Sequence, residues 1–161
     1  MEHLQFSKLS GAYRLYCKQE LPVSIEEAWD FFSNPSNLEK ITPGNLRFQI
    51  TSKDVRRCFP GQIITYTIRL NKWIKMSWVT EISHVKDFEY FIDEQRFGPY
   101  KMWHHLHRFT PTENGILMED VVHFRLPFHL LSGPVYKLYV RRNLQKIFGY
   151  RYKKLGELFK M

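Results

Sequence analysis

The chain has 161 residues, carries a formal net charge of +8, and 16% of its side chains are aromatic, enough to line a cavity as well as fill a core. This length fits one domain spanning 1–161, and no apolar run reaches the ~18 residues of a membrane-spanning helix. The N-terminus lacks the charged start and apolar run of a secretory signal, so a cytoplasmic location is expected.

Residues 13–21 alternate between apolar and polar side chains, which predicts a strand with one buried face. Two short helices should follow. Ser24 and Glu27 have the spacing of a capping box at the start of the first helix. For the second helix, Asn34 is the predicted N-cap and Pro35 the first helical residue. Pro43-Gly44 ends this helical region.

Beyond this point the apolar period changes to two residues. Turn signals such as Asn71-Lys72 and Asn114-Gly115 separate short alternating runs, which favours an antiparallel meander. The predicted strands are 46–50, 62–70, 73–83, 88–95, 100–109 and 116–126.

One long helix is predicted over residues 134–161. This segment holds eight of the 24 lysines and arginines and a single acidic residue, Glu157. Its second half has an apolar stripe at about 100° per residue. The stripe consists of Leu144, Ile147, Phe148, Leu155 and Phe159, and Arg151 interrupts it. Arg142, Lys146 and Lys153 lie on the opposite face, which is either solvated or able to contact an anionic membrane or nucleic acid.

Four strings of the chain are informative: LPVSIEEAWDFFSNPSNLEKITP (21–43), FGPYKMWHHLHRF (97–109), LPFHLL (126–131) and YVRRNLQKIFGYR (139–151). They resemble the START/Bet v 1-like (SRPBCC) superfamily and, within it, the bacterial polyketide-cyclase-like, ligand-binding group. The resemblance implies an α+β helix-grip fold, in which a seven-stranded antiparallel sheet wraps around the long C-terminal helix, with two short helices after the first strand. It also implies a ligand cavity between sheet and helix. The superfamily includes ligand carriers, cyclases and hydrolases, so the fold does not fix the function.

The run from Trp103 to Phe109 holds the strongest candidate site. Strand alternation places Trp103, His105, His107 and Phe109 on one face, which we assign to the cavity. The two imidazoles could anchor a polar group of a ligand, or they could be bonded to polar groups of neighbouring strands. They could also share a metal ion if a third ligand came from Asp93, Glu119 or Asp120; we expect no metal and no cofactor.

Further candidates come from the neighbouring elements. Phe91 and Asp93 share a face, and Asp93 could orient a histidine or simply be solvated. On the last strand Asp120 shares an apolar face with Phe124, so it is either a buried partner of Arg151 or a residue at the cavity mouth. The pair with Arg151 is the more specific expectation, because buried charges are seldom left unpaired. Arg151 could instead bind an anionic ligand group or reach water. Tyr66 and Trp78 are expected in the core and, in part, on the cavity wall.

Three functions fit these observations. The first is binding of a small hydrophobic or amphipathic molecule in an internal cavity. The second is a cyclase, dehydratase or hydrolase activity with His105 or His107 as general base and Asp93 as the orienting group. The third is an interaction module that uses the basic helix face. The sequence contains no glycine-rich phosphate loop and no Ser-His-Asp motif. Cys17 and Cys58 fit no metal or redox spacing and indicate a reducing compartment.

Overall fold

The computed structural model describes residues 4–53, 57–69, 75–127 and 132–160. Within these residues one antiparallel sheet has the strand order β1-β2-β8-β7-β6-β5-β4-β3. The strands are β1 (Leu4–Leu9), β2 (Ala12–Leu21), β3 (Gln49–Ile50), β4 (Gln62–Arg69), β5 (Lys75–Lys86), β6 (Tyr90–Phe97), β7 (Met102–Thr112) and β8 (Gly115–Arg125). The predicted connection at Asn71-Lys72 and the last four residues of the LPFHLL string, residues 128–131, lie outside the described residues.

The two helices expected after the first predicted strand are present. Helix α1 (Ile25–Phe32) begins at Ser24, whose hydroxyl accepts a hydrogen bond from the Glu27 backbone N–H at 3.1 Å. The second, Pro35–Ile41, is a 3₁₀ helix capped by Asn34, and a short 3₁₀ turn, Gly44–Leu46, follows it. Pro43 explains why this segment stays short, because a proline disfavours helical geometry in the residue before it.

The C-terminal helix is less regular than predicted. It comprises α2 (Ser132–Val135), a π-helical turn (Tyr136–Val140) and α3 (Arg141–Leu158). The wide turn is visible in the backbone, since the N–H of Arg141 bonds to the carbonyl of Tyr136, five residues back. The ring of Tyr136 stacks on Tyr13 of β2 at a centroid distance of 3.8 Å, which ties the turn to the sheet. No helix in the described ranges is long and apolar enough to cross a membrane.

The described sheet has eight strands, one more than the seven expected. The additional strand is β1, which pairs with β2 through a turn that contains Gly11 at φ +72°. It lies at the sheet edge, and only Leu4 and Phe6 are partly buried. An edge strand with so little buried surface leaves no clear alternation in the sequence, and that is why it was missed.

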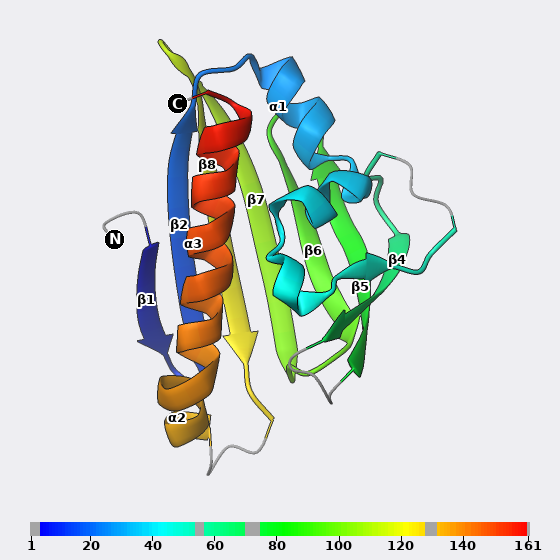
Figure 1. The fold of residues 1–161 in the computed structure, drawn as a ribbon, viewed down its shortest axis with the longest axis vertical. Helices are drawn as coiled ribbons and strands as arrows, with labels where there is room; N and C mark the ends of the chain where they lie inside the picture. Colours follow the sequence, from blue (N-terminus) through cyan, green and yellow to red (C-terminus); the bar gives the residue numbers. More distant parts are fainter. Residues whose placement is uncertain (1–3, 54–56, 70–74, 128–131, 161) are drawn as a thin grey trace.

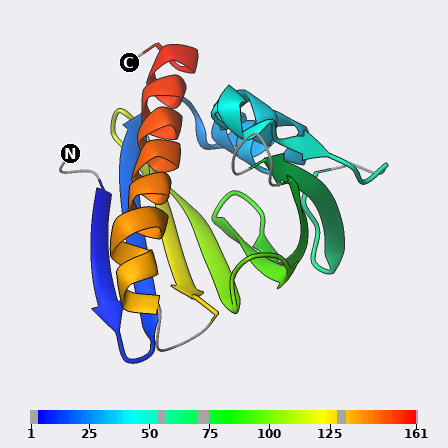
Figure 2. The same ribbon diagram turned by 60° about the horizontal axis from the view of Figure 1, so that its bottom comes forward.

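The sheet curves around the C-terminal helix. In Figures 1 and 2, α3 crosses the face of β2 and β8, and the 3₁₀ helices cover the face of β5 and β6 further along the sheet. Irregular register between β5 and β6, at Val79/Thr80 and Ile82/His84, adds twist where the sheet bends. Two apolar clusters result, one beneath α1 around Trp29 and one beneath the start of the C-terminal helix around Phe124.

Candidate functional site

A cavity of about 830 Å³ lies between the concave face of the sheet, the C-terminal helix and the 3₁₀ helices. Val135, Tyr139 and Tyr150 line it and are also exposed to solvent, so the cavity reaches the surface beside the C-terminal helix. Much of its wall is apolar, including Leu38, Ile41, Leu46, Phe48, Ile64, Ile68, Leu144 and Ile147.

Strand β7 turns the predicted face towards this cavity. Trp103, His105, His107 and Phe109 are all buried, whereas the residues between them are partly exposed or exposed. The structure therefore places this face of β7 towards the interior. The two histidines occupy the stretch of β7 between the apolar clusters, where a polar group can face the cavity.

Strand register brings two carboxylates to the two imidazoles. Asp93 of β6 lies opposite His105, and Asp120 of β8 lies opposite His107. The four side chains form what we call the His–Asp cluster. Of the two alternatives for Asp93, the structure shows the contact with a histidine, because Asp93 Oδ2 lies 2.7 Å from His107 Nε2.

Each imidazole in the cluster contacts both carboxylates. His105 Nε2 lies 2.9 Å from Asp120 Oδ1, and its Nδ1 lies 3.3 Å from Asp93 Oδ2. His107 is reversed, with Nε2 towards Asp93 and Nδ1 3.0 Å from Asp120 Oδ1. The ring centroids are 3.7 Å apart. One oxygen of each carboxylate is thus shared by the two imidazoles, whose ring planes are tilted by 35°.

The contacts within the cluster shift the pKa of His105, Asp93 and Asp120. Burial by itself would lower the pKa of His105, but the carboxylates of Asp93 and Asp120 outweigh it and raise that pKa to about 8. Burial would raise the pKa of each carboxyl group, but hydrogen bonds and charge from the histidines hold both well below their ordinary values. The two carboxylates are therefore ionised at neutral pH and pair with the imidazolium of His105.

Arg151 of α3 joins the cluster from the helix side. Its Nη1 lies 3.7 Å from Asp120 Oδ2, so the predicted pairing of these charges is confirmed at a distance longer than a hydrogen bond. The guanidinium also lies over the Phe148 ring, 5.1 Å from its centroid. Within the described part of the chain, neither Asp120 Oδ2 nor Arg151 Nε has a hydrogen-bond partner.

The structure brings most of the predicted site residues to the cavity wall: Tyr66, Trp78, Phe91, Asp93, Trp103, His105, His107, Asp120, Phe148 and Arg151. Phe109 and Phe124 instead pack in the core, beyond the two ends of the cavity. Phe109 contacts Trp29 of α1 at a centroid distance of 5.9 Å, and Phe124 stacks on Tyr13 at 5.6 Å. Their strand face was predicted correctly, but α1 and the π-helical turn cover the sheet at those points.

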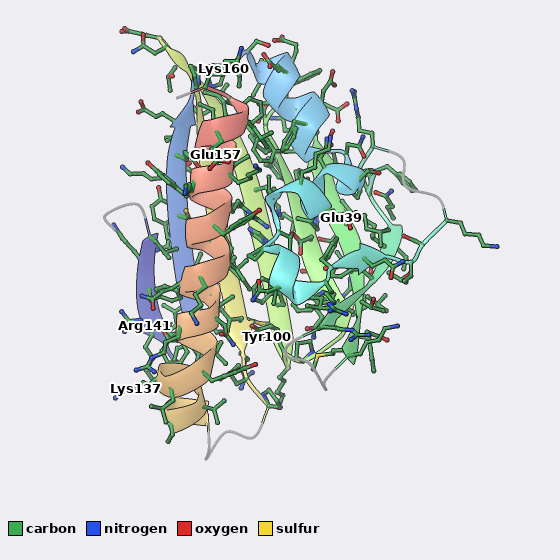
Figure 3. All side chains as sticks on the ribbon, in the orientation of Figure 1. Glu39, Tyr100, Lys137, Arg141, Glu157 and Lys160 are labelled. Atoms are coloured by element: carbon green, nitrogen blue, oxygen red, sulfur yellow. The ribbon has the colours of Figure 1, made fainter. Side chains whose placement is uncertain are left out.

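Two other predicted groups lie away from the cluster. Glu119, one candidate third metal ligand, is on the outer face of the sheet, where it accepts a hydrogen bond from Tyr16 at 2.6 Å. The basic residues Arg142, Lys146 and Lys153 are exposed on α3. Figure 3 labels Lys137 and Arg141 near the start of the C-terminal helix and Lys160 at its far end, so positive charge follows its whole length.

The cavity wall formed by the 3₁₀ helices was not predicted as part of the site. The sequence indicated an apolar side for residues 35–41 through Leu38 and Ile41. Helical periodicity shows that this side is buried, but it cannot show that it faces the imidazoles of β7. That placement depends on the curvature of the sheet between the two segments.

Known protein-family models do not match this sequence, and no curated protein does either. Solved structures do match. Protein NE0264 from Nitrosomonas europaea is 19% identical with a TM-score of 0.67, covering 91% of this chain and 94% of that one. Protein Ms6760 from Mycobacterium smegmatis is 17% identical with a TM-score of 0.65, covering 91% and 90%. Ginseng major latex-like protein 151 from Panax ginseng is 11% identical with a TM-score of 0.66, covering 93% and 99%.

At these identities the similarity shows the fold alone. This chain has the same fold as these solved structures. The predicted helix-grip architecture is therefore confirmed, with β1 added at the sheet edge. In this helix-grip the His–Asp cluster lies on the sheet side of the cavity and Arg151 on the helix side.

Proposed function

We propose that the protein binds a small hydrophobic or amphipathic molecule in the cavity between the sheet and the C-terminal helix. The observation that carries this proposal is the combination of an 830 Å³ volume, mostly apolar walls and one buried ionic cluster. Small-molecule sites are typically about 300–1,000 Å³, with apolar walls and a few convergent polar groups. The opening beside Val135 and Tyr139 provides a route of entry.

The exposure of the polar groups indicates how such a ligand would lie. The side chain of Asp93 is 16% exposed and that of Arg151 is 11% exposed, whereas Asp120 is fully buried. A polar end of the ligand would therefore meet Asp93 and Arg151. Its apolar part would lie against Trp78 and Leu144, towards the opening.

The histidine geometry favours binding over general-base catalysis. A general base needs a free lone pair within hydrogen-bond reach of the substrate proton. All four ring nitrogens of His105 and His107 lie within 3.3 Å of a carboxylate oxygen. The carboxyl groups of Asp93 and Asp120 have lowered pKa values, which makes them weak bases.

A pair of variants on one strand tests the proposal. Ile68 lines the cavity, and Ile63, on the other face of β4, is 49% exposed. Ile68→Trp should fill part of the cavity, whereas Ile63→Trp adds the same ring to the outer surface. We expect saturable one-to-one binding of an anilinonaphthalene sulfonate dye by the wild-type chain and Ile63→Trp, and binding at least tenfold weaker in Ile68→Trp.

Native mass spectrometry of gently purified protein provides an independent readout. A bound mass of a few hundred daltons, lost in Ile68→Trp, would identify the ligand class. Equal dye binding by Ile68→Trp and wild type, with both proteins folded by circular dichroism, would place the binding site outside the cavity and refute the proposal.

A further inference from the structure

Three side chains of the His–Asp cluster are of the types that bind metal ions, and they lie close together. Asp93 Oδ2, His105 Nδ1 and His107 Nε2 converge on one region, and the ligand atoms of these residues lie within 4.8 Å of one another. Two imidazoles and one carboxylate are a common donor set for divalent transition metals. All three residues line the cavity, so an ion among them would face it.

The strands hold these donors in place. His105 and His107 project from the same face of β7, and the β6–β7 register sets Asp93 opposite His105. Trp103 lies edge-on to His105, and Phe91 stacks on His107 at a centroid distance of 4.2 Å. Rings packed in this way lose little further freedom when they bind an ion, because their orientation is already fixed.

Asp120 lies next to the ring nitrogens of His105 and His107 that would not bind the metal ion. Ligating imidazoles usually donate their second ring N–H to a carboxylate, which fixes the tautomer. Asp120 Oδ1 accepts the hydrogen bond from His105 Nε2 at 2.9 Å and lies 3.0 Å from His107 Nδ1. When both nitrogens donate to Asp120, the lone pairs of His105 Nδ1 and His107 Nε2 are directed towards Asp93.

Arg151 determines which end of the cluster can accept a cation. Its guanidinium lies 3.7 Å from Asp120 Oδ2, so positive charge already faces that carboxylate. Repulsion from Arg151 disfavours a second cation beside Asp120. The Asp93 end is thus the favoured position for an ion, with Asp120 buried behind the rings.

We propose that Asp93, His105 and His107 bind a divalent transition-metal ion of the zinc or cobalt type, with Asp120 orienting the two imidazoles. Ligand bonds of about 2.0–2.1 Å in a tetrahedral site separate the ligand atoms by about 3.3 Å. The contact between His105 Nδ1 and Asp93 Oδ2 is already 3.3 Å, and the 2.7 Å contact to His107 Nε2 has to open slightly. The ion replaces the protons between these atoms, and its remaining position is open to the cavity.

The test uses untagged full-length protein, stripped with a chelator and titrated with zinc sulfate by calorimetry. We expect one ion per chain. Asp93→Asn and His107→Gln should reduce binding to background, and Asp120→Asn should weaken it about 10–100-fold through the loss of imidazole orientation. Cobalt(II) added to the wild-type chain should give the ligand-field absorption of a four-coordinate site, a readout that needs no variant.

His104→Gln is the matched control, because His104 is on the same strand but faces outwards, opposite His123 of β8. Zinc binding should be unchanged in this variant. Binding that is lost in His104→Gln and kept in Asp93→Asn would assign the ion to the outer-face histidines and overturn the proposal, as would a stripped wild-type chain that takes up no ion. Dye binding by the stripped protein tests the proposed ligand cavity separately, so the two proposals can fail independently.

Discussion

Replacement of Asp120 by asparagine should destabilise the protein strongly. Asp120 is fully buried, and its carboxylate faces His105 at 2.9 Å, His107 at 3.0 Å and Arg151 at 3.7 Å. Asparagine keeps the shape but removes the negative charge, which leaves buried positive charge without its partner. Removing one member of a buried ion pair typically costs about 3–5 kcal/mol, and we expect a loss in the free energy of unfolding of this size.

The measurement is urea unfolding, followed by circular dichroism in the presence of a chelator so that metal binding does not contribute. Glu119→Gln is the matched control, since Glu119 is adjacent to Asp120 on β8 but lies on the outer face, where it accepts a hydrogen bond from the Tyr16 hydroxyl. That change should cost no more than about 1 kcal/mol.

A double substitution separates charge imbalance from lost packing. Combining Asp120→Asn with Arg151→Met removes the unpaired guanidinium, and we expect the double variant to recover about 0.5–3 kcal/mol relative to additivity. If Asp120→Asn lost less than about 1 kcal/mol, the carboxylate would not be the buried counter-charge described above, and the reasoning would be refuted.

Four further predictions concern pH, cysteine reactivity and backbone conformation. The pKa of His105 is raised from 6.5 to about 8, so its contribution to stability is full below about pH 6.5 and is lost as the pH rises through 8; urea midpoints measured across this range should fall, and a flat profile would contradict the ion pairing. Conversely, the lowered pKa of the Asp120 carboxyl gives stability that is present above its ordinary value of 3.8 and lost as the pH falls below it, which acid titration followed by tryptophan fluorescence should detect. Burial raises the pKa of both Cys17 and Cys58 to about 12, so neither thiol should react with an aromatic disulfide reagent at pH 8 until the protein unfolds; rapid native labelling would show that the thiols are accessible. Gly115→Ala should destabilise the β7–β8 hairpin by more than about 1 kcal/mol, because the new Cβ would clash with the Leu21 carbonyl oxygen; thermal unfolding equal to that of wild type would exclude this clash.

Much of the cluster could be predicted from local patterns. Alternation along 103–109 identified the buried face of β7, because neighbouring side chains of a strand point to opposite sides. The pairing of Asp120 with Arg151 followed from two charges at positions where the patterns required apolar residues. Such exceptions are informative, since a buried charge without a partner is unfavourable.

Other features were not readable from any single segment. The π-helical turn at Tyr136–Val140 contains no proline or glycine that would indicate it in the sequence. Strand β1 buries too few side chains to show a clear alternation of apolar and polar residues. The positions of Phe109 and Phe124 in the core depend on which helical segment covers each end of their strands.

The sequence alone predicted the order of the elements from β2 onwards and the inward face that carries His105 and His107, because these follow from side-chain periodicity and turn residues. The helix-grip fold was implied by the resemblance of four residue strings to a known superfamily. Only the tertiary structure decided that both imidazoles share both carboxylates and that Leu38 and Ile41 close the cavity opposite them. The contacts within the cluster depend on the relative register of β6, β7 and β8. The closing wall depends on the curvature of the sheet, which is set by long-range packing against the C-terminal helix and leaves no periodic trace in the chain.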